Sequence, residues 1–312
     1  MPKPIRRNRP IGLIGLGLMG SAIAERLRAA GYPVLGWDIA APARSHLRTL
    51  GGQPATDATD VFTRCDRILL SLPDSNITRA VFRDATSELH YGHIIADTTT
   101  GDPRDAIELS RQLAPTGATY LDATISGNSD QVRRSEVLVM VGGLKTAFTR
   151  CQELFATFAA RTIHTGLVGS AAQMKLVTNL VLGLNRAALA EGLVFAQALK
   201  LDGKQALEIL RASMAYSRIM DVKGEKMLRH DFKPQARLSQ HHKDVRLMLA
   251  AAAQAHTKLP LSETHHKILT AAEAAGLGQL DNSAIIRVIG ARPRRNGAPA
   301  SVKTKRRARS AP

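Results

Sequence analysis

The first half of the chain alternates short apolar runs with stretches of helical periodicity. The runs that have the length and composition of strands are "IGLIGL", "PVLGWD", "RILLSL", "HIIADT", "ATYLDAT", "VLVMVGG" and "RTIHTG". Helical patterns lie between them, as at residues 21–30, 104–113 and 145–158. Such alternation predicts an α/β domain with a mostly parallel sheet that is covered by helices on both sides.

After Gly166 the strand pattern stops. Residues 170–290 are rich in Ala and Leu and show helical periodicity, interrupted by the turn segments "LDGK", "DFKP", "KLPLS" and "LGQLDN". We therefore expect an all-α C-terminal domain. The predicted division is an α/β domain at 10–166, an all-helical domain at 167–290 and a basic tail at 291–312.

The net charge of +17 is concentrated at the two ends of the 312-residue chain. Residues 1–10 and 291–312 carry twelve Lys and Arg side chains and no acid, which leaves a net charge of only +5 between them. The C-terminal segment is rich in Pro, Gly, Ala and Ser, and we expect it to be disordered. Neither end has an aromatic residue for base stacking, so weak, salt-sensitive attraction to polyanions is favoured over a specific nucleic-acid partner.

Signals for disulfides, membrane spans and metals are weak. Cys65 and Cys151 lie far apart and match no metal or redox spacing, which favours a reducing, cytoplasmic compartment. No apolar run is long enough to span a bilayer, since the best candidate, 178–201, is interrupted by polar residues. The histidine pairs at 241–242 and 265–266 have no acid or thiol ligand at a usual spacing, so no metal is expected.

A glycine-rich turn follows the first predicted strand and opens a helix. Its residues are Gly15, Leu16, Gly17, Leu18, Met19 and Gly20. The first glycine permits a tight turn, the second lets the backbone approach a pyrophosphate, and the third lets helix and strand pack closely. The second predicted strand ends in Asp38, where a carboxylate accepts hydrogen bonds from a ribose diol and repels a 2′-phosphate. We therefore predict a Rossmann-type, doubly wound domain that binds NAD in preference to NADP, although Arg44 leaves NADP open.

The helix expected after the domain boundary carries a cation and an amide four positions apart, Lys175 and Asn179. The surrounding segment, "AAQMKLVTNLVLGL", holds no other charge. Oxidation of an alcohol by hydride transfer needs a group that takes the hydroxyl proton, and desolvation lowers the pKa of a lysine enough to provide a neutral amine. The alternative is an ordinary surface pair at i,i+4. We favour Lys175 as the proton carrier, with Asn179 holding the substrate oxygen or the lysine.

Six motifs, in order over residues 10–290, resemble those of the β-hydroxyacid dehydrogenases, which include 3-hydroxyisobutyrate and tartronate semialdehyde types. They are the glycine turn Gly15–Gly20, Leu72-Pro73, Asp97–Thr100, "DATISGN" at Asp122–Asn128, the segment from Gly166 to Asn179, and Lys243-Asp244. The resemblance implies a Rossmann-type domain followed by an all-α domain. It also implies NAD(P)-dependent oxidation of a short 3-hydroxy acid, or reduction of the matching semialdehyde.

The resemblance also implies cofactor contacts outside the glycine turn. Leu72 and Pro73 would lie at the cofactor, and Thr100 would lie near the nicotinamide ribose. Lys243 would reach from the second domain towards the nicotinamide and the substrate.

For the substrate, the resemblance makes Lys175 the general acid/base and lets Asn179 orient the substrate. Ser126, with the backbone N–H groups of Gly127 and Asn128, would bind the substrate carboxylate, an anion that a hydroxyl and amides suit.

The chain departs from the family pattern at several positions. It has Thr124 for the usual proline, Ile125 for valine, Asn128 for the final glycine, Ser135-Glu136-Val137 for Gly-Thr-Leu, and Ala171 for a glycine. These departures concern the identity of the substrate rather than the type of reaction. Arg133 and Arg134 could serve a second anionic group, although paired exposed arginines seldom do so.

Other functions remain to be compared with this one. An imine reductase on the same scaffold usually lacks the lysine, and a sugar-acid phosphate dehydrogenase normally has a longer second domain. A non-catalytic cofactor-binding interaction protein, with a basic tail that attracts nucleic acid, need not keep Lys175 and Asn179. Small residues at Gly183, Ala187 and Ala190 fit close packing inside the domain or a subunit seam. The resemblance implies a homo-oligomer, a dimer or a tetramer.

Overall fold

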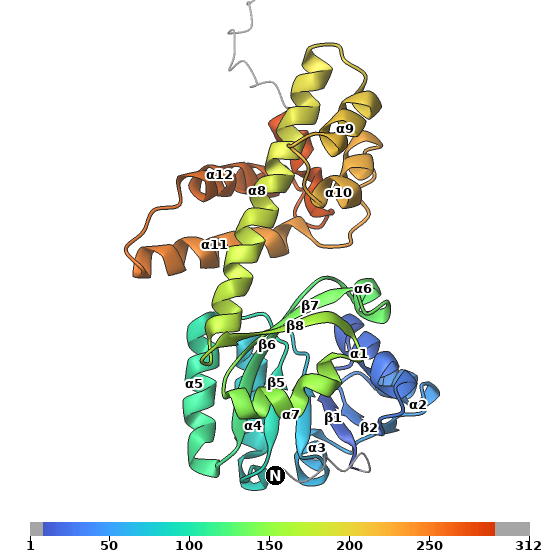
Figure 1. The fold of residues 1–312 in the computed structure, drawn as a ribbon, viewed down its shortest axis with the longest axis vertical. Helices are drawn as coiled ribbons and strands as arrows, with labels where there is room; N and C mark the ends of the chain where they lie inside the picture. Colours follow the sequence, from blue (N-terminus) through green and yellow to red (C-terminus); the bar gives the residue numbers. More distant parts are fainter. Residues whose placement is uncertain (1–8, 291–312) are drawn as a thin grey trace, which may run out of the picture. The chain divides into compact units, whose positions relative to one another are not determined.

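The apolar runs of the first half form the strands of one sheet (Figure 1). The computed structural model describes residues 9–290, and within them the sheet has eight strands in the order β3-β2-β1-β4-β5-β6-β7-β8. The strands are β1 (Ile11–Ile14), β2 (Val34–Trp37), β3 (Gln53–Pro54), β4 (Arg67–Leu70), β5 (Ile94–Asp97), β6 (Thr119–Ser126), β7 (Val137–Gly142) and β8 (Ala159–Gly166). Neighbours are parallel except for β6 and β7, which are antiparallel. The predicted mostly parallel sheet is confirmed.

Helices cover both faces of this sheet (Figure 1). They are α1 (Leu18–Ala29), α2 (Ala41–Thr49), α3 (Ala58–Arg64), α4 (Ser75–Asp84), α5 (Pro103–Leu113), α6 (Ser129–Arg133) and α7 (Lys145–Phe155), with short 3₁₀ turns at Thr86–Glu88 and Ala114–Thr116. Successive strand residues enter opposite cores, as Leu13 packs with α1 and α7 while Ile14 packs with α3 and α5. Because both faces are buried, the strands are continuous apolar runs rather than alternating ones.

The remaining described elements are helical, which confirms the predicted all-α region. They are α8 (Ser170–Ala198), α9 (Gly203–Ala212), α10 (Ile219–Leu228), α11 (Leu238–Gln254), α12 (Pro260–Ala274), a 3₁₀ turn at Asn282–Ile285 and α13 (Ile286–Ile289). Within the described residues, one compact unit contains the sheet, residues 9–183 and Lys243–Ser262, while the other contains Leu184–His242 and residues 263–290. The predicted domain boundaries stay a prediction, and the basic tail at 291–312 lies outside the described residues.

The helix α8 corrects one expectation. Within residues 9–290 it is the one helix long and apolar enough, by length and composition alone, to cross a membrane. The expectation that no segment is long enough was therefore wrong, because a helix of this length tolerates the few polar residues that interrupt it. Core helices of soluble proteins pass the same test. The first turns of α8 make polar contacts with the sheet, which are described below.

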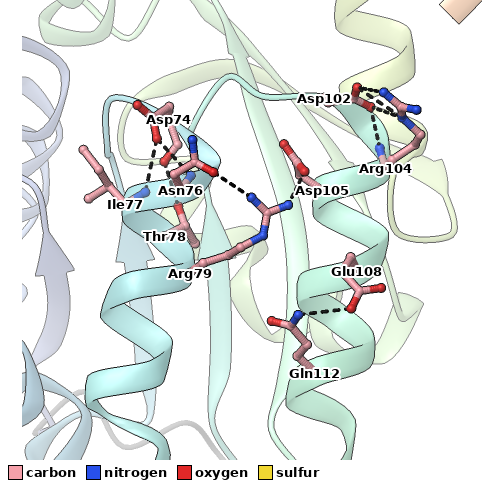
Figure 2. A network of polar contacts seen from close by, with 10 residues as sticks. All are labelled: Asp74, Asn76, Ile77, Thr78, Arg79, Asp102, Arg104, Asp105, Glu108 and Gln112. Atoms are coloured by element: carbon pink, nitrogen blue, oxygen red, sulfur yellow. Dashed lines mark hydrogen bonds and ion pairs between the residues drawn. The ribbon is translucent and has the colours of Figure 1, made fainter.

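The helices α4 and α5 are joined by a network of polar contacts (Figure 2). Asp74 and Asp102 cap the N-termini of α4 and α5 through backbone N–H groups. Arg79 bridges the two helices by its ion pair with Asp105, and it also bonds to Asn76 on its own helix. Both side chains of this pair are half-buried at the surface, where ion pairs contribute about 0–1 kcal/mol, so the network supplements the apolar packing of the two helices.

Candidate functional site

The glycine turn between β1 and α1 has three glycines with three different surroundings. Gly15 has φ +92°, and a Cβ there would lie 2.2 Å from the carbonyl oxygen of Ser71. A Cβ on Gly20 would lie 1.9 Å from the carbonyl oxygen of Gly15. Nothing lies within 4 Å of the Cβ position of Gly17. Gly15 and Gly20 are therefore required by internal packing, while Gly17 leaves room for a group to approach the backbone.

The N-terminus of α1 is suited to an anion. Gly17 is the N-cap and provides no side-chain cap, and the first turn contains no acid. The first N–H groups of a helix have no partner within the helix and carry a partial positive charge. Leu16 is buried, Met19 packs against the core, and Leu18 is 80% exposed. A pyrophosphate fits this cradle of open backbone and uncapped helix end.

Asp38 lies at the end of β2 beside the glycine turn. Its Oδ2 accepts from Leu16 N at 2.7 Å and its Oδ1 accepts from Ala40 N at 2.8 Å. Arg44 stacks over the ring of Trp37 at 4.6 Å and donates to the backbone carbonyl oxygen of Asp38 at 2.6 Å. The carboxylate is thus fixed next to the turn, and the guanidinium is bound to the loop that carries it.

The ends of β4 and β5 adjoin the glycine turn. Leu72 contributes the Cδ2 atom that lies 3.2 Å from the Cβ position of Gly15, and its N–H donates to Thr99 Oγ1 at 3.2 Å. Pro73 is exposed and Thr100 is half-buried. Because β1, β4 and β5 are parallel neighbours, their carboxyl ends meet at one edge of the sheet, where ligands bind in doubly wound folds.

The segment after β6 differs from the expectation in one donor. Asn128 is the N-cap of α6 in a capping box: its Oδ1 accepts from Gln131 N at 2.9 Å, and its N–H donates to Gln131 Oε1 at 3.0 Å. The N–H of Asn128, expected to bind the carboxylate, is therefore occupied by Gln131. The signal for this was present in the sequence as Asn-x-x-Gln.

The two other donors expected to bind the carboxylate, at Ser126 and Gly127, differ from Asn128 in their surroundings. The Ser126 hydroxyl makes no hydrogen bond within residues 9–290, and Gly127 is exposed. Gly127 has φ +148°, and a Cβ there would lie 2.5 Å from Val137 Cγ1, so only glycine fits without a shift.

Lys175 points back to the strand that ends at Ser126. Its Nζ donates to the carbonyl oxygen of Ile125 at 2.7 Å. Burial lowers the pKa of Lys175, and the negative charge of Asp244 opposes that change. Asn179, one turn on, donates from Nδ2 to Asp244 Oδ2 at 3.1 Å. The Ile125 carbonyl could not be predicted as the partner of Lys175, because a backbone acceptor has no side-chain signature.

Other candidate residues have different surroundings. Lys243 is half-buried on α11 and belongs to the same compact unit as the sheet and Lys175. Arg133 is paired with Glu25, and Arg134 is paired with Glu136, so both arginines are engaged within the protein. Within the described part of the chain, no group of three or more His, Cys, Asp or Glu side chains is arranged to hold a metal ion.

Two family models match nearly the whole described chain. The model described as the NAD binding domain of 6-phosphogluconate dehydrogenase matches residues 10–166. The model described as "NAD-binding of NADP-dependent 3-hydroxyisobutyrate dehydrogenase" matches residues 169–289.

Comparisons with individual proteins agree with the two family models. The 2-hydroxy-3-oxopropionate reductase of Escherichia coli (strain K12) is 30% identical over 282 residues, which are 89% of this chain and 96% of that protein. A Mycobacterium tuberculosis 3-hydroxyisobutyrate dehydrogenase structure, described with L-serine, matches with a TM-score of 0.84 at 26% identity and covers 91% of this chain and 99% of that one. An imine reductase from Pseudomonas sp. has a TM-score of 0.62 at 20% identity over 90% of this chain and 100% of its own, a likeness of fold alone.

Proposed function

Because the chain belongs to the β-hydroxyacid dehydrogenase family, we propose that it uses Lys175 as the general acid/base on a short 3-hydroxy acid or its semialdehyde. The chain is an NAD(P)-dependent oxidoreductase, as the relatives of this family are. The single observation that carries the role of Lys175 is its half-buried amine, held 2.7 Å from the carbonyl oxygen that precedes Ser126.

The cofactor is held by the edge of the sheet where β1, β2, β4 and β5 end. The N-terminus of α1 and the open backbone at Gly17 receive the pyrophosphate, and Asp38 receives the adenosine ribose diol. Leu72, Pro73 and Thr100 lie along the nicotinamide half. When bound, the nicotinamide accepts or supplies the hydride.

Lys175 moves the proton that accompanies this transfer. In the oxidative direction the neutral amine takes the hydroxyl proton, and in the reductive direction the ammonium returns it to the new alkoxide. A lowered pKa makes the neutral form available at lower pH than for an ordinary lysine, so oxidation quickens as the pH rises through this value and reduction slows. The Ile125 carbonyl keeps the amine oriented, while the charge of Asp244, whose carboxylate is held by Asn179, favours the ammonium.

The substrate carboxylate is bound by the Ser126 hydroxyl and the Gly127 N–H. Asn128 lies at the mouth of the site, but its N–H donates to Gln131 and does not bind the carboxylate. The names of relatives support this substrate class, since 2-hydroxy-3-oxopropionate is a carboxylate with an aldehyde at carbon 3, and L-serine is a carboxylate with a hydroxyl at carbon 3.

NAD is the preferred cofactor. The Asp38 carboxylate, fixed by two backbone N–H groups, would repel a 2′-phosphate. Arg44 is held over Trp37 and against the Asp38 carbonyl, so it must leave both to neutralise such a phosphate.

The protein works as a homo-oligomer in the cytoplasm. The helix α8 exposes large apolar side chains, namely Met174, Val177, Val181, Leu182 and Phe195, which a second copy of the chain would cover. Cys65 and Cys151 are buried free thiols, as suits a reducing compartment.

A substrate panel tests the proposed function. Purified protein is mixed with NAD or NADP and a set of C3 to C5 3-hydroxy acids, with matched semialdehydes and cyclic imines in the reverse direction, and cofactor absorbance is followed. Turnover of a 3-hydroxy acid with a higher kcat/KM for NAD supports the proposal. Turnover of imines alone would favour an imine reductase, and a silent panel with tight, tail-dependent DNA binding would favour the non-catalytic alternative.

A further inference from the structure

The strand β6 carries polar side chains at alternate positions of one face. Asp122, Thr124 and Ser126 alternate along it and therefore point to the same side of the sheet. Asp122 is 3% exposed and Thr124 is 2% exposed. Burying such groups destabilises the fold unless hydrogen bonds satisfy them, so the partners of these two side chains are informative.

Both side chains are satisfied by the start of α8. Asp122 accepts from Gly169 N at 3.0 Å and from Ala172 N at 2.9 Å. Thr124 donates from Oγ1 to the carbonyl oxygen of Ala171 at 3.1 Å. Asp122 thus caps orphan N–H groups at the helix start, whereas the threonine binds a carbonyl that already belongs to the helical ladder.

That carbonyl is directly connected to Lys175. In an α-helix the N–H of residue 175 bonds to the carbonyl of residue 171, so Thr124 and the Lys175 backbone share one acceptor. The Lys175 side chain then returns to the same strand, where Nζ donates to the Ile125 carbonyl, one residue after Thr124. Two hydrogen bonds therefore join β6 to α8 near the amine: one from Thr124 to the Ala171 carbonyl, and one from Lys175 to the Ile125 carbonyl.

We propose that Thr124 is a positioning residue for Lys175: its hydroxyl fixes the first turn of α8 against β6, so that Nζ stays on the Ile125 carbonyl beside Ser126. The inference rests on the proposed function, and it concerns a position where the family pattern has proline, which has no hydroxyl to donate.

Loss of the Thr124 hydrogen bond would loosen the joint between β6 and the start of α8, and this should change the pKa of Lys175. The charged group that acts on Lys175 is Asp244 on α11, whose carboxylate favours the ammonium. Asp122 on β6 instead accepts hydrogen bonds from backbone N–H groups at the start of α8. Neither changes when the Thr124 hydroxyl is removed. Water that enters between β6 and α8 reduces the desolvation of Nζ, so the pKa of Lys175 rises towards its ordinary value.

The test compares Thr124→Val, which removes the hydroxyl at nearly constant shape, with Thr124→Ser, which keeps it. The matched control is Thr157→Val, since the Thr157 hydroxyl also donates to a backbone carbonyl, that of Leu154, but outside the joint. Two readouts are recorded on the full chain: the pH dependence of Lys175 acetylation by acetic anhydride, followed on its peptide by mass spectrometry, and the pH profiles of kcat and KM. The first readout does not require activity.

For Thr124→Val we expect the pKa of Lys175 to rise towards its ordinary value and the oxidative kcat near neutral pH to fall about three- to tenfold, with KM little changed. Thr124→Ser and Thr157→Val should keep the parent profile. If Thr124→Val folds too poorly to assay, Thr124→Ala is compared with Thr124→Ser in its place.

A hydroxyl-free variant with the parent labelling curve and the parent kcat would overturn the inference, as would an equal shift in Thr157→Val. Failure of the proposed function is recognised separately, because a fully active Lys175→Ala protein would contradict the role of the lysine whatever the labelling shows.

Discussion

Two buried polar clusters of this protein share an electrostatic signature and differ in everything else. At the joint of β6 and α8, burial lowers the pKa of Lys175. Between α11 and α12, burial and the nearby charge of Arg186 together lower the pKa of His265 to about 4 and that of His241 to well below its ordinary value. By pKa alone, both clusters would be candidate active sites.

Their geometry separates them. Lys175 lies beside Ser126, whose hydroxyl has no partner within the described chain, at the end of a strand. His241 and His265 face each other with ring centroids 5.2 Å apart. His242 is engaged on both sides, by Glu273 at 2.8 Å and His266 at 2.9 Å. A lowered pKa therefore records burial, and it indicates chemistry only where the base has room to meet a substrate.

The largest expected effect is that of Lys175→Ala. Removal of the proton carrier should lower kcat by about 10²- to 10⁴-fold, the usual contribution of a general acid/base. Folding and NAD binding should persist, since only a side chain that is costly to bury is lost. Steady-state kinetics, thermal unfolding and NAD titration measure these three quantities. Lys204→Ala, at an exposed lysine on α9, is the control. Activity of Lys175→Ala within about tenfold of the parent would refute the assignment.

Asp244→Asn should produce a smaller change that is opposite in sign to that of Thr124→Val. The carboxylate raises the pKa of Lys175 against the effect of burial, so its neutralisation should lower that pKa. We expect the acid limb of the oxidative pH profile to move to lower pH, with a loss of plateau kcat below about tenfold because Asn179 keeps only a neutral acceptor. A limb that moves up, or stays, would contradict the placement of this charge.

His265→Gln should leave activity near neutral pH unchanged and alter stability in acid. The folded pKa of about 4 lies below the ordinary 6.5, so the unfolded chain binds a proton that the folded chain refuses as the pH falls between these values. This histidine should therefore destabilise the fold by roughly 2–3 kcal/mol between about pH 7 and pH 4. Denaturant unfolding at several pH values measures this effect, and the free energy of unfolding should depend less on pH in the variant than in the parent. A loss of kcat near neutral pH would instead link the histidines to catalysis.

Much of the fold was predictable because burial on both faces makes the strands visible as apolar runs. The exception is β3 (Gln53–Pro54), which is too short to leave a pattern. The glycine turn was predictable because positions 15 and 20 have no room for a Cβ atom, so only glycine fits there.

The contacts of the site were less predictable. The capping box of Asn128 and Gln131 could have been recognised from its spacing, but its consequence for the carboxylate donors depends on the folded backbone. The bond from Asn179 to Asp244 joins positions 65 residues apart, and the bond from Lys175 ends on a backbone carbonyl. Such contacts depend on how α8 packs against β6 and α11, which no local pattern specifies.

The most direct measurement is a crystal structure with NAD and a 3-hydroxy acid bound. We expect the substrate carboxylate to bind the Ser126 hydroxyl and the Lys175 Nζ to lie within about 3 Å of the carbinol oxygen. A structure in which another side chain meets that oxygen, while Lys175 remains away from the substrate, would contradict it.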